Sequence, residues 1–138
     1  AFSEQPGMGL SCFIGRNNNE VIKLDLFYTD SFIFPELTIN GIRMAYAKEI
    51  AAMKLDVIGH GGRKQDFWDI HELLDHYSLS KLIEFYKARY PYSHSRSDLL
   101  KKLITFNEAD DDFDPICLKE KYWQLIKLDI EEAVEKLK

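Results

Sequence analysis

The chain has 138 residues, of which 46% are hydrophobic and 13% aromatic, a composition typical of one packed globular domain rather than a disordered segment. Its formal net charge of −5 excludes a general attraction to nucleic acid or anionic membranes. No apolar run is long enough to cross a bilayer, so we expect a soluble, cytoplasmic protein. Cys12 and Cys117 match no metal-binding spacing, which indicates free thiols, with a single disulfide as the alternative. Because the chain begins at Ala1 without an initiator methionine, we expect a piece of a longer protein.

The first third of the chain predicts a small antiparallel sheet. Residues 10–16 and 20–28 are rich in β-branched and aromatic side chains, and a run of three asparagines between them favours the tight turn of a hairpin. Asp25 lies in the second of these strands, on a face that also carries apolar residues. Residues 32–35 and 37–45 predict more extended chain, the latter broken by an Asn-Gly turn.

The remainder of the chain has helical periodicity. The expected fold class is therefore α+β, a single domain with a sheet portion over residues 1–45 and a helical bundle over residues 46–138. Ser78 and either Ser95 or Ser97 are candidate helix N-caps, and Pro91 ends the third helix. Helices are expected at 47–59, 64–77, 79–90, 96–106 and from 120 to the end, with an acidic loop over 108–114.

Two ionisable residues fall among apolar positions of the first two helices. Lys54 lies near the centre of an apolar arc, and Asp66 lies between Ile70 and Leu73. The arc consists of Tyr46, Ala47, Ile50, Ala51, Met53, Leu55, Val57 and Ile58, and the opposite, polar face of Lys48, Glu49 and Asp56. Because lysine and aspartate are rarely buried unless paired, we interpret Lys54 and Asp66 as a pair at a functional site. The alternative is that Lys54 reaches solvent along its aliphatic stem while Asp66 caps a helix.

Other polar features have competing interpretations. The acidic loop has spacings that suit a divalent cation, but a solvated surface turn is favoured. His71 and His76 are five residues apart, which is the wrong spacing for two ligands on one helical face, so we expect surface residues. The glycine-rich loop at 59–64 suits a phosphate or a plain turn. Basic residues between 81 and 102 suit a polyanion, although the solvated side of two helices is favoured.

The chain carries three distinctive sequence blocks, Asn-Gly-Ile-Arg at 40–43, Glu-Ile-Ala-Ala-Met-Lys-Leu at 49–55 and Arg-Lys-Gln-Asp-Phe-Trp-Asp-Ile at 63–70. Together with the segments 79–91 and 99–112, these blocks resemble the AbiEii/AbiGii toxin family of nucleotidyltransferases. The resemblance implies a nucleotidyltransferase fold and a toxin of a two-gene toxin–antitoxin or phage-defence system. It also implies transfer of a nucleotide from a nucleoside triphosphate, with Mg²⁺, onto RNA such as tRNA ends or onto protein.

The resemblance also assigns roles to individual residues. Lys54 matches the lysine that contacts the triphosphate, and Asp66 matches the essential aspartate of the last family motif. Cofactor-binding positions are Arg63, Lys64 and Asp69, and the third carboxylate of the metal site is Asp25. The leading Asp-x-Asp strand of the family is not found before Asp25. We therefore expect this chain alone to bind Mg²⁺ poorly and to transfer nothing. The alternative is a noncatalytic interaction domain that binds an antitoxin or RNA.

Overall fold

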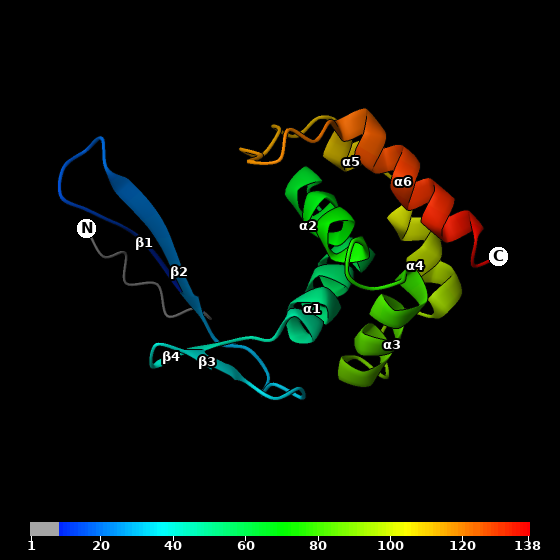
Figure 1. Ribbon diagram of the computed structural model, residues 1–138, viewed down its shortest axis with the longest axis horizontal. Helices are drawn as coiled ribbons and strands as arrows, with labels where there is room; N and C mark the ends of the chain where they lie inside the picture. The colour runs from blue at the N-terminus through cyan, green and yellow to red at the C-terminus, as the bar shows by residue number, and fades with distance from the viewer. Residues whose placement is uncertain (1–8) are drawn as a thin grey trace. The chain divides into compact units, whose positions relative to one another are not determined.

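A computed structural model describes residues 9–138 and divides the chain into two compact units, Ala1–Ser31 and Phe32–Lys138 (Figure 1). The predicted α+β class is confirmed, because two small antiparallel sheets precede a group of helices. The boundary between the units comes earlier than the predicted change from sheet to helical portion at residue 45, since the second hairpin belongs to the same unit as the helices.

The first unit contains a two-stranded hairpin. Strand β1, Gly9–Gly15, pairs antiparallel with β2, Val21–Phe27, so that Ser11 lies directly opposite Asp25. The asparagine turn is closed by the Asn17 side chain, which accepts a hydrogen bond from the Asn19 N–H at 2.9 Å. Every residue of β2 is exposed, so the alternation of apolar residues produces no buried face in this strand.

A second hairpin opens the larger unit. Strands β3, Leu37–Ile39, and β4, Ile42–Met44, meet at a turn in which Asn40 and Gly41 have φ values of 52° and 78°. Positive φ at both central residues is the requirement of a type I′ turn, which explains the Asn-Gly pair. Residues 32–35, predicted as extended chain, form neither helix nor strand, and the backbone N–H groups of Ile33 and Phe34 donate to a helix side chain instead of a neighbouring strand.

The five predicted helices are present, although the second and the fourth each end three residues earlier than predicted, and a short helix opens the segment predicted as an acidic loop. The structure places α1 at Ala47–Gly59, α2 at Lys64–Leu74, α3 at Leu79–Arg89, α4 at Arg96–Leu103, α5 at Asn107–Asp110 and α6 at Trp123–Glu135. Ser95, not Ser97, caps α4, since its hydroxyl accepts the Asp98 N–H at 3.1 Å. The last helix starts later than predicted because Glu120 has a φ of 51°, which no α-helix accommodates.

One hydrophobic core holds the helices together. Helix α1 packs against α2, α3 and α4, and α6 packs against α2 and α4 (Figure 1). Aromatic rings pack where α2 meets α6, with Phe67 and Trp68 both within 6.0 Å of the Trp123 ring between centroids. Burial of this apolar surface is the main stabilising contribution. The side chains with no exposed surface include Leu55, Ile70, Leu82, Tyr86, Leu99, Leu103, Ile126 and Ile130.

The described residues also bear on the thiols and on membrane insertion. Cys12 and Cys117 are both free, as the sequence predicted. Across residues 9–138, the helices are too short or too polar for any of them to span a bilayer.

Candidate functional site

Lys54 lies between two carboxylates of the neighbouring helix. Its Nζ is 2.8 Å from Oδ1 of Asp66 and 2.7 Å from Oδ2 of Asp69. Asp66 and Asp69 are three residues apart, which places both on one face of α2, toward α1. The predicted pairing of Lys54 with Asp66 is thus confirmed. We call these three residues the Lys54 cluster.

Asp66 serves two purposes at once. Its Oδ1 atom accepts a hydrogen bond from the Lys54 ammonium, and its Oδ2 atom accepts one from the backbone N–H of Arg63 at 3.0 Å. The carboxylate therefore satisfies an otherwise unpaired N–H at the start of α2 and lies at the positive end of the helix dipole. Pairing and capping, which the sequence left as alternatives, are both correct for this residue.

The charge on Lys54 is fixed by its partners. Burial alone lowers the pKa of the ammonium, but the hydrogen bonds donated to Asp66 and Asp69 favour the charged form more strongly, and the resulting pKa is raised. Lys54 is consequently a permanent cation at neutral pH, suited to binding an anion and unsuited to accepting a proton. About a quarter of its side chain, 27%, is open to solvent, against 6% for Asp66.

The other two predicted cations pair with the acidic segment, residues 110–114. Arg63 donates from Nε and Nη2 to the two carboxylate oxygens of Asp112, both at 3.3 Å. Lys64 Nζ is 2.9 Å from Oδ1 of Asp114 and 5.5 Å from the centre of the Trp123 ring. Hydrogen bonding to Arg63 lowers the pKa of Asp112, and Asp112 in turn raises the pKa of Arg63. This contact fixes the segment against the start of α2.

The groups that bind the Asp112 carboxylate are of the kind that bind phosphate in other proteins. Besides the guanidinium of Arg63, its Oδ2 atom accepts the backbone N–H of Lys64, at the N-terminus of α2, at 3.3 Å. A helix N-terminus together with an arginine is an arrangement that binds anions. A pocket of about 310 Å³ adjoins this contact, lined by Gly61, Gly62, Arg63, Glu108, Asp111 and Asp112. The interpretation of the acidic loop as a solvated turn is wrong for Asp112, whose side chain is only 18% exposed.

Asp25 lies in the first unit, on the hairpin. Ser11 on the facing strand donates its hydroxyl to Oδ1, and Lys23 Nζ is 3.0 Å from Oδ2. The Ser11 hydrogen bond, followed by those of Lys23, lowers the pKa of Asp25. Mg²⁺ prefers ionised carboxylates as ligands, but it needs six oxygen ligands in all, and Asp25 is a single carboxylate. Both oxygens of Asp25 already accept hydrogen bonds within the hairpin, so Asp25 offers Mg²⁺ at most one of its ligands.

A second ion pair on α1 was not predicted. Glu49 has no exposed surface; its carboxylate pairs with Arg89 of α3 and accepts the N–H groups of Ile33 at 3.2 Å and Phe34 at 2.8 Å. The prediction of Glu49 on the polar face of α1 is therefore wrong. The buried stripe of the helix is rotated toward Glu49, which leaves Ile50, predicted inside, 41% exposed. No local sequence pattern links residues 40 positions apart, so only the packing of α1 on α3 shows this pair.

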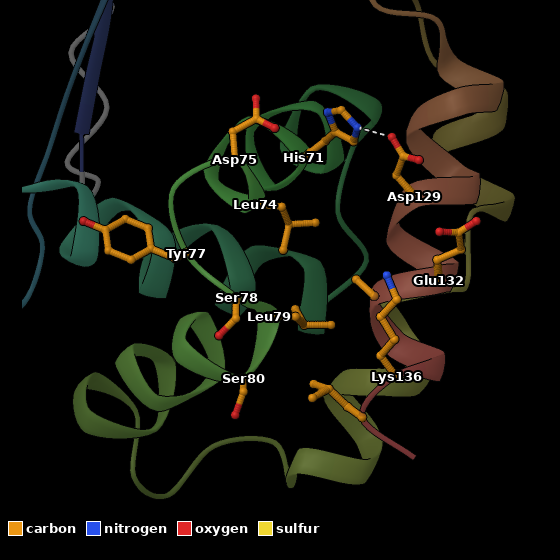
Figure 2. A pocket seen from close by; sticks show the side chains of 12 residues that line it. His71, Leu74, Asp75, Tyr77, Ser78, Leu79, Ser80, Asp129, Glu132 and Lys136 are labelled. Carbon is orange, nitrogen blue, oxygen red and sulfur yellow. Dashed lines mark hydrogen bonds and ion pairs between the residues drawn. The ribbon is translucent and has the colours of Figure 1, made fainter.

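His71 lines another pocket, of about 400 Å³, where α2, the start of α3 and α6 meet (Figure 2). Its Nε2 atom is 2.7 Å from Oδ2 of Asp129, and Lys121 Nζ is 2.9 Å from its Nδ1 atom. Only 12% of the His71 side chain is exposed, so its predicted surface location is wrong, whereas His76 is exposed as expected. The contact between His71 and Asp129 therefore joins α2 to α6.

Comparison of the chain with family models, with curated proteins and with solved structures finds no match. The functional assignment accordingly depends on the chemistry of the residues described above. Its strongest elements are the Lys54 cluster and the start of α2, where Arg63 and the Lys64 N–H bind the carboxylate of Asp112.

Proposed function

We propose that this chain is part of a cytoplasmic nucleotidyltransferase-like toxin of the AbiEii/AbiGii kind. It would transfer a nucleotide from a nucleoside triphosphate onto RNA, tRNA ends in particular, or onto a protein. The observation that supports the proposal most directly is the Lys54 cluster, in which a buried and a half-exposed carboxylate hold a partly exposed ammonium. With 27% of its side chain exposed, Lys54 would offer its ammonium to a phosphate oxygen of the substrate.

Each residue of the site has a role in this proposal. Lys54 and Arg63 bind triphosphate oxygens, and Asp66 and Asp69 act as positioning residues that hold Lys54 in one orientation. Lys64 contributes its backbone N–H at the start of α2 and its ammonium beside Trp123. Phosphoryl transfer depends mainly on positioning and on neutralising charge, which these groups supply.

Binding of Mg²⁺ and of the acceptor would require further groups in addition to the residues described above. Bound Mg²⁺ would neutralise phosphate charge and align the reacting oxygens. Apolar side chains on both faces of the hairpin are exposed, including Phe13 at 69%, Ile22 at 75% and Phe27 at 64%. Because two strands alone are marginally stable, these faces support a hairpin that belongs to a larger nucleotidyltransferase sheet. The proposal keeps the expectation that the 138-residue chain alone transfers nothing.

One observation favours a second candidate function. All three predicted phosphate-binding cations, Lys54, Arg63 and Lys64, already pair with carboxylates of this chain. In a noncatalytic domain that binds an antitoxin or RNA, the same pairs would only fix the packing of α1, α2 and the acidic segment. Accessibility of the cations to an added anion separates the two candidates.

A thermal-shift titration of the 138-residue chain with the four nucleoside triphosphates makes this test. A ligand that binds the folded state alone raises the melting temperature. We expect at least one triphosphate to raise it, Lys54→Met to abolish the rise, and Lys102→Ala, which removes an exposed lysine of α4, to leave it unchanged. No shift with any triphosphate would favour the interaction domain. Transfer of labelled nucleotide to tRNA by this chain would overturn its expected inactivity.

A further inference from the structure

Three side chains with metal-binding atoms come together away from the Lys54 cluster. Asp56 and His60 lie one turn apart at the C-terminal end of α1, and His94 comes from the segment between α3 and α4. One ligand atom from each of the three lies within 4.8 Å of the others. The two imidazole rings meet edge to face, with centroids 4.7 Å apart.

Hydrogen bonds hold both histidines in position. His60 Nδ1 is 2.8 Å from the backbone carbonyl oxygen of Asp56. A proton donated from Nδ1 to that carbonyl leaves the lone pair of Nε2 available, which is the usual state of a metal-binding histidine. His94 is held from the core, because its backbone N–H donates to the hydroxyl of the fully buried Tyr86 at 3.1 Å and its Nδ1 is 3.3 Å from the same oxygen.

The last residue of α1 makes room for this arrangement. A Cβ atom at Gly59 would lie 2.9 Å from Nδ1 of His94, which is closer than real Cβ contacts allow. Glycine is therefore required for the His94 ring to lie against the end of α1. Ser93 Oγ, 3.4 Å from Asp56 Oδ1 and 3.3 Å from His94 Nδ1, adds a hydroxyl between two of the three ligands.

We propose that Asp56, His60 and His94 form a zinc site. Two imidazole nitrogens and one carboxylate oxygen are a ligand set that Zn²⁺ takes in four-coordinate sites, with the fourth position left to water or a substrate atom. The nitrogen ligands disfavour Mg²⁺ and Ca²⁺, which require oxygen. The ion joins α1 to the segment between α3 and α4. This inference is independent of the proposed nucleotide site and stands if that proposal fails.

The test uses the 138-residue chain freed of metal by a chelator. Titration calorimetry is expected to give one Zn²⁺ per chain, and Zn²⁺ but not Mg²⁺ is expected to raise the melting temperature. His60→Ala abolishes both effects; because the His60 side chain is 64% exposed, the variant folds. His76→Ala removes an exposed histidine of the same unit and leaves binding intact. Cobalt bound in place of zinc shows the visible absorption of tetrahedral Co²⁺ in the parent chain and not in His60→Ala.

Two further variants test the support of His94. Tyr86→Phe removes the hydroxyl behind His94 and Gly59→Ala displaces its ring; loss of such support is expected to weaken Zn²⁺ binding about 10-fold. Circular dichroism verifies that each variant is folded. Absence of Zn²⁺ binding to the parent chain overturns the proposal, as does equal binding to the parent chain and His60→Ala.

Discussion

Helix α1 carries two ion-paired sites that differ in their access to solvent. Glu49 and Arg89 are 0% and 2% exposed in their side chains, whereas Lys54 is 27% exposed and Asp69 51%. Glu49 and Lys54 are five residues apart, which separates them by roughly 140° around the helix. The two sites thus face different surroundings on the same element.

The difference separates a structural ion pair from a candidate binding site. Glu49 is surrounded by donors from this chain, since Arg89 and two backbone N–H groups share its carboxylate. Such a pair holds the chain before β3 and helix α3 against α1. Lys54 pairs with two carboxylates, but 27% of its side chain is exposed, so its ammonium stays accessible from solvent. Burial of an ionisable residue therefore does not by itself indicate a binding site, since Glu49 and Arg89 are both buried. A difference in exposure between the partners, as between Lys54 and Asp66, is the better indicator.

The largest expected effect is on stability, at the buried pair. Glu49→Ala removes the carboxylate that pairs with the buried Arg89 and accepts two backbone N–H groups, and the free energy of unfolding should fall by about 3 to 5 kcal/mol. Urea denaturation followed by circular dichroism measures the change. Glu84→Ala, which breaks an exposed pair with Lys81 in α3, is the control and should change little. A loss below about 1 kcal/mol for Glu49→Ala would remove the distinction between the two sites.

A smaller stability effect is expected at the Lys54 cluster. Lys54→Met leaves Asp66 buried with the Arg63 N–H as its remaining partner, which should cost about 1 to 2 kcal/mol because solvent reaches part of the cluster. Urea denaturation measures this cost, and Asp69→Asn, at a half-exposed position, should cost less. A loss for Lys54→Met as large as that for Glu49→Ala would indicate that Lys54 is equally structural.

The acidic segment gives a finer test of anion binding. Asp112→Asn frees Arg63 and the start of α2, so the proposed triphosphate affinity should rise by at most about 5-fold, which is what an exposed ion pair is worth. Fluorescence titration with a labelled triphosphate measures it. Glu131→Gln removes the same charge from an exposed position of α6 and serves as the matched control. An equal rise in both variants would point to general electrostatics instead of a specific anion position.

The smallest effect concerns an exposed network with no proposed ligand. Hydrogen bonds from Lys119 and Lys121 lower the pKa of Glu72 from 4.5 to about 2. Because the folded pKa is below the unfolded one, the stabilisation is complete above pH 4.5 and is lost as the pH falls through 2. Carbon NMR of the Glu72 carboxyl measures the pKa, which Lys121→Met should raise. An unchanged pKa in that variant would show that Lys121 contributes nothing.

The site was partly predictable from the sequence. Lys54 and Asp66 stand out because each interrupts an apolar pattern, and they do pair. The pattern was nevertheless imperfect, since Ile50 and Val57 of the predicted arc are 41% and 46% exposed. The contact between Arg63 and Asp112 joins residues 49 positions apart, and neither residue interrupts a local pattern.

The sequence by itself determined the local structure of this protein. The Asn-Gly turn of the second hairpin, the serine caps of α3 and α4, and the proline after α3 act through φ preferences and hydrogen bonds with near neighbours, so their positions are readable along the chain.

Only the tertiary structure decided the other pairings of charged groups and of histidines. Glu49 with Arg89, His71 with Asp129, and His60 with His94 each join elements whose mutual packing depends on the whole core. The free energy of such a contact depends on burial and distance, and neither quantity is defined until the helices have packed.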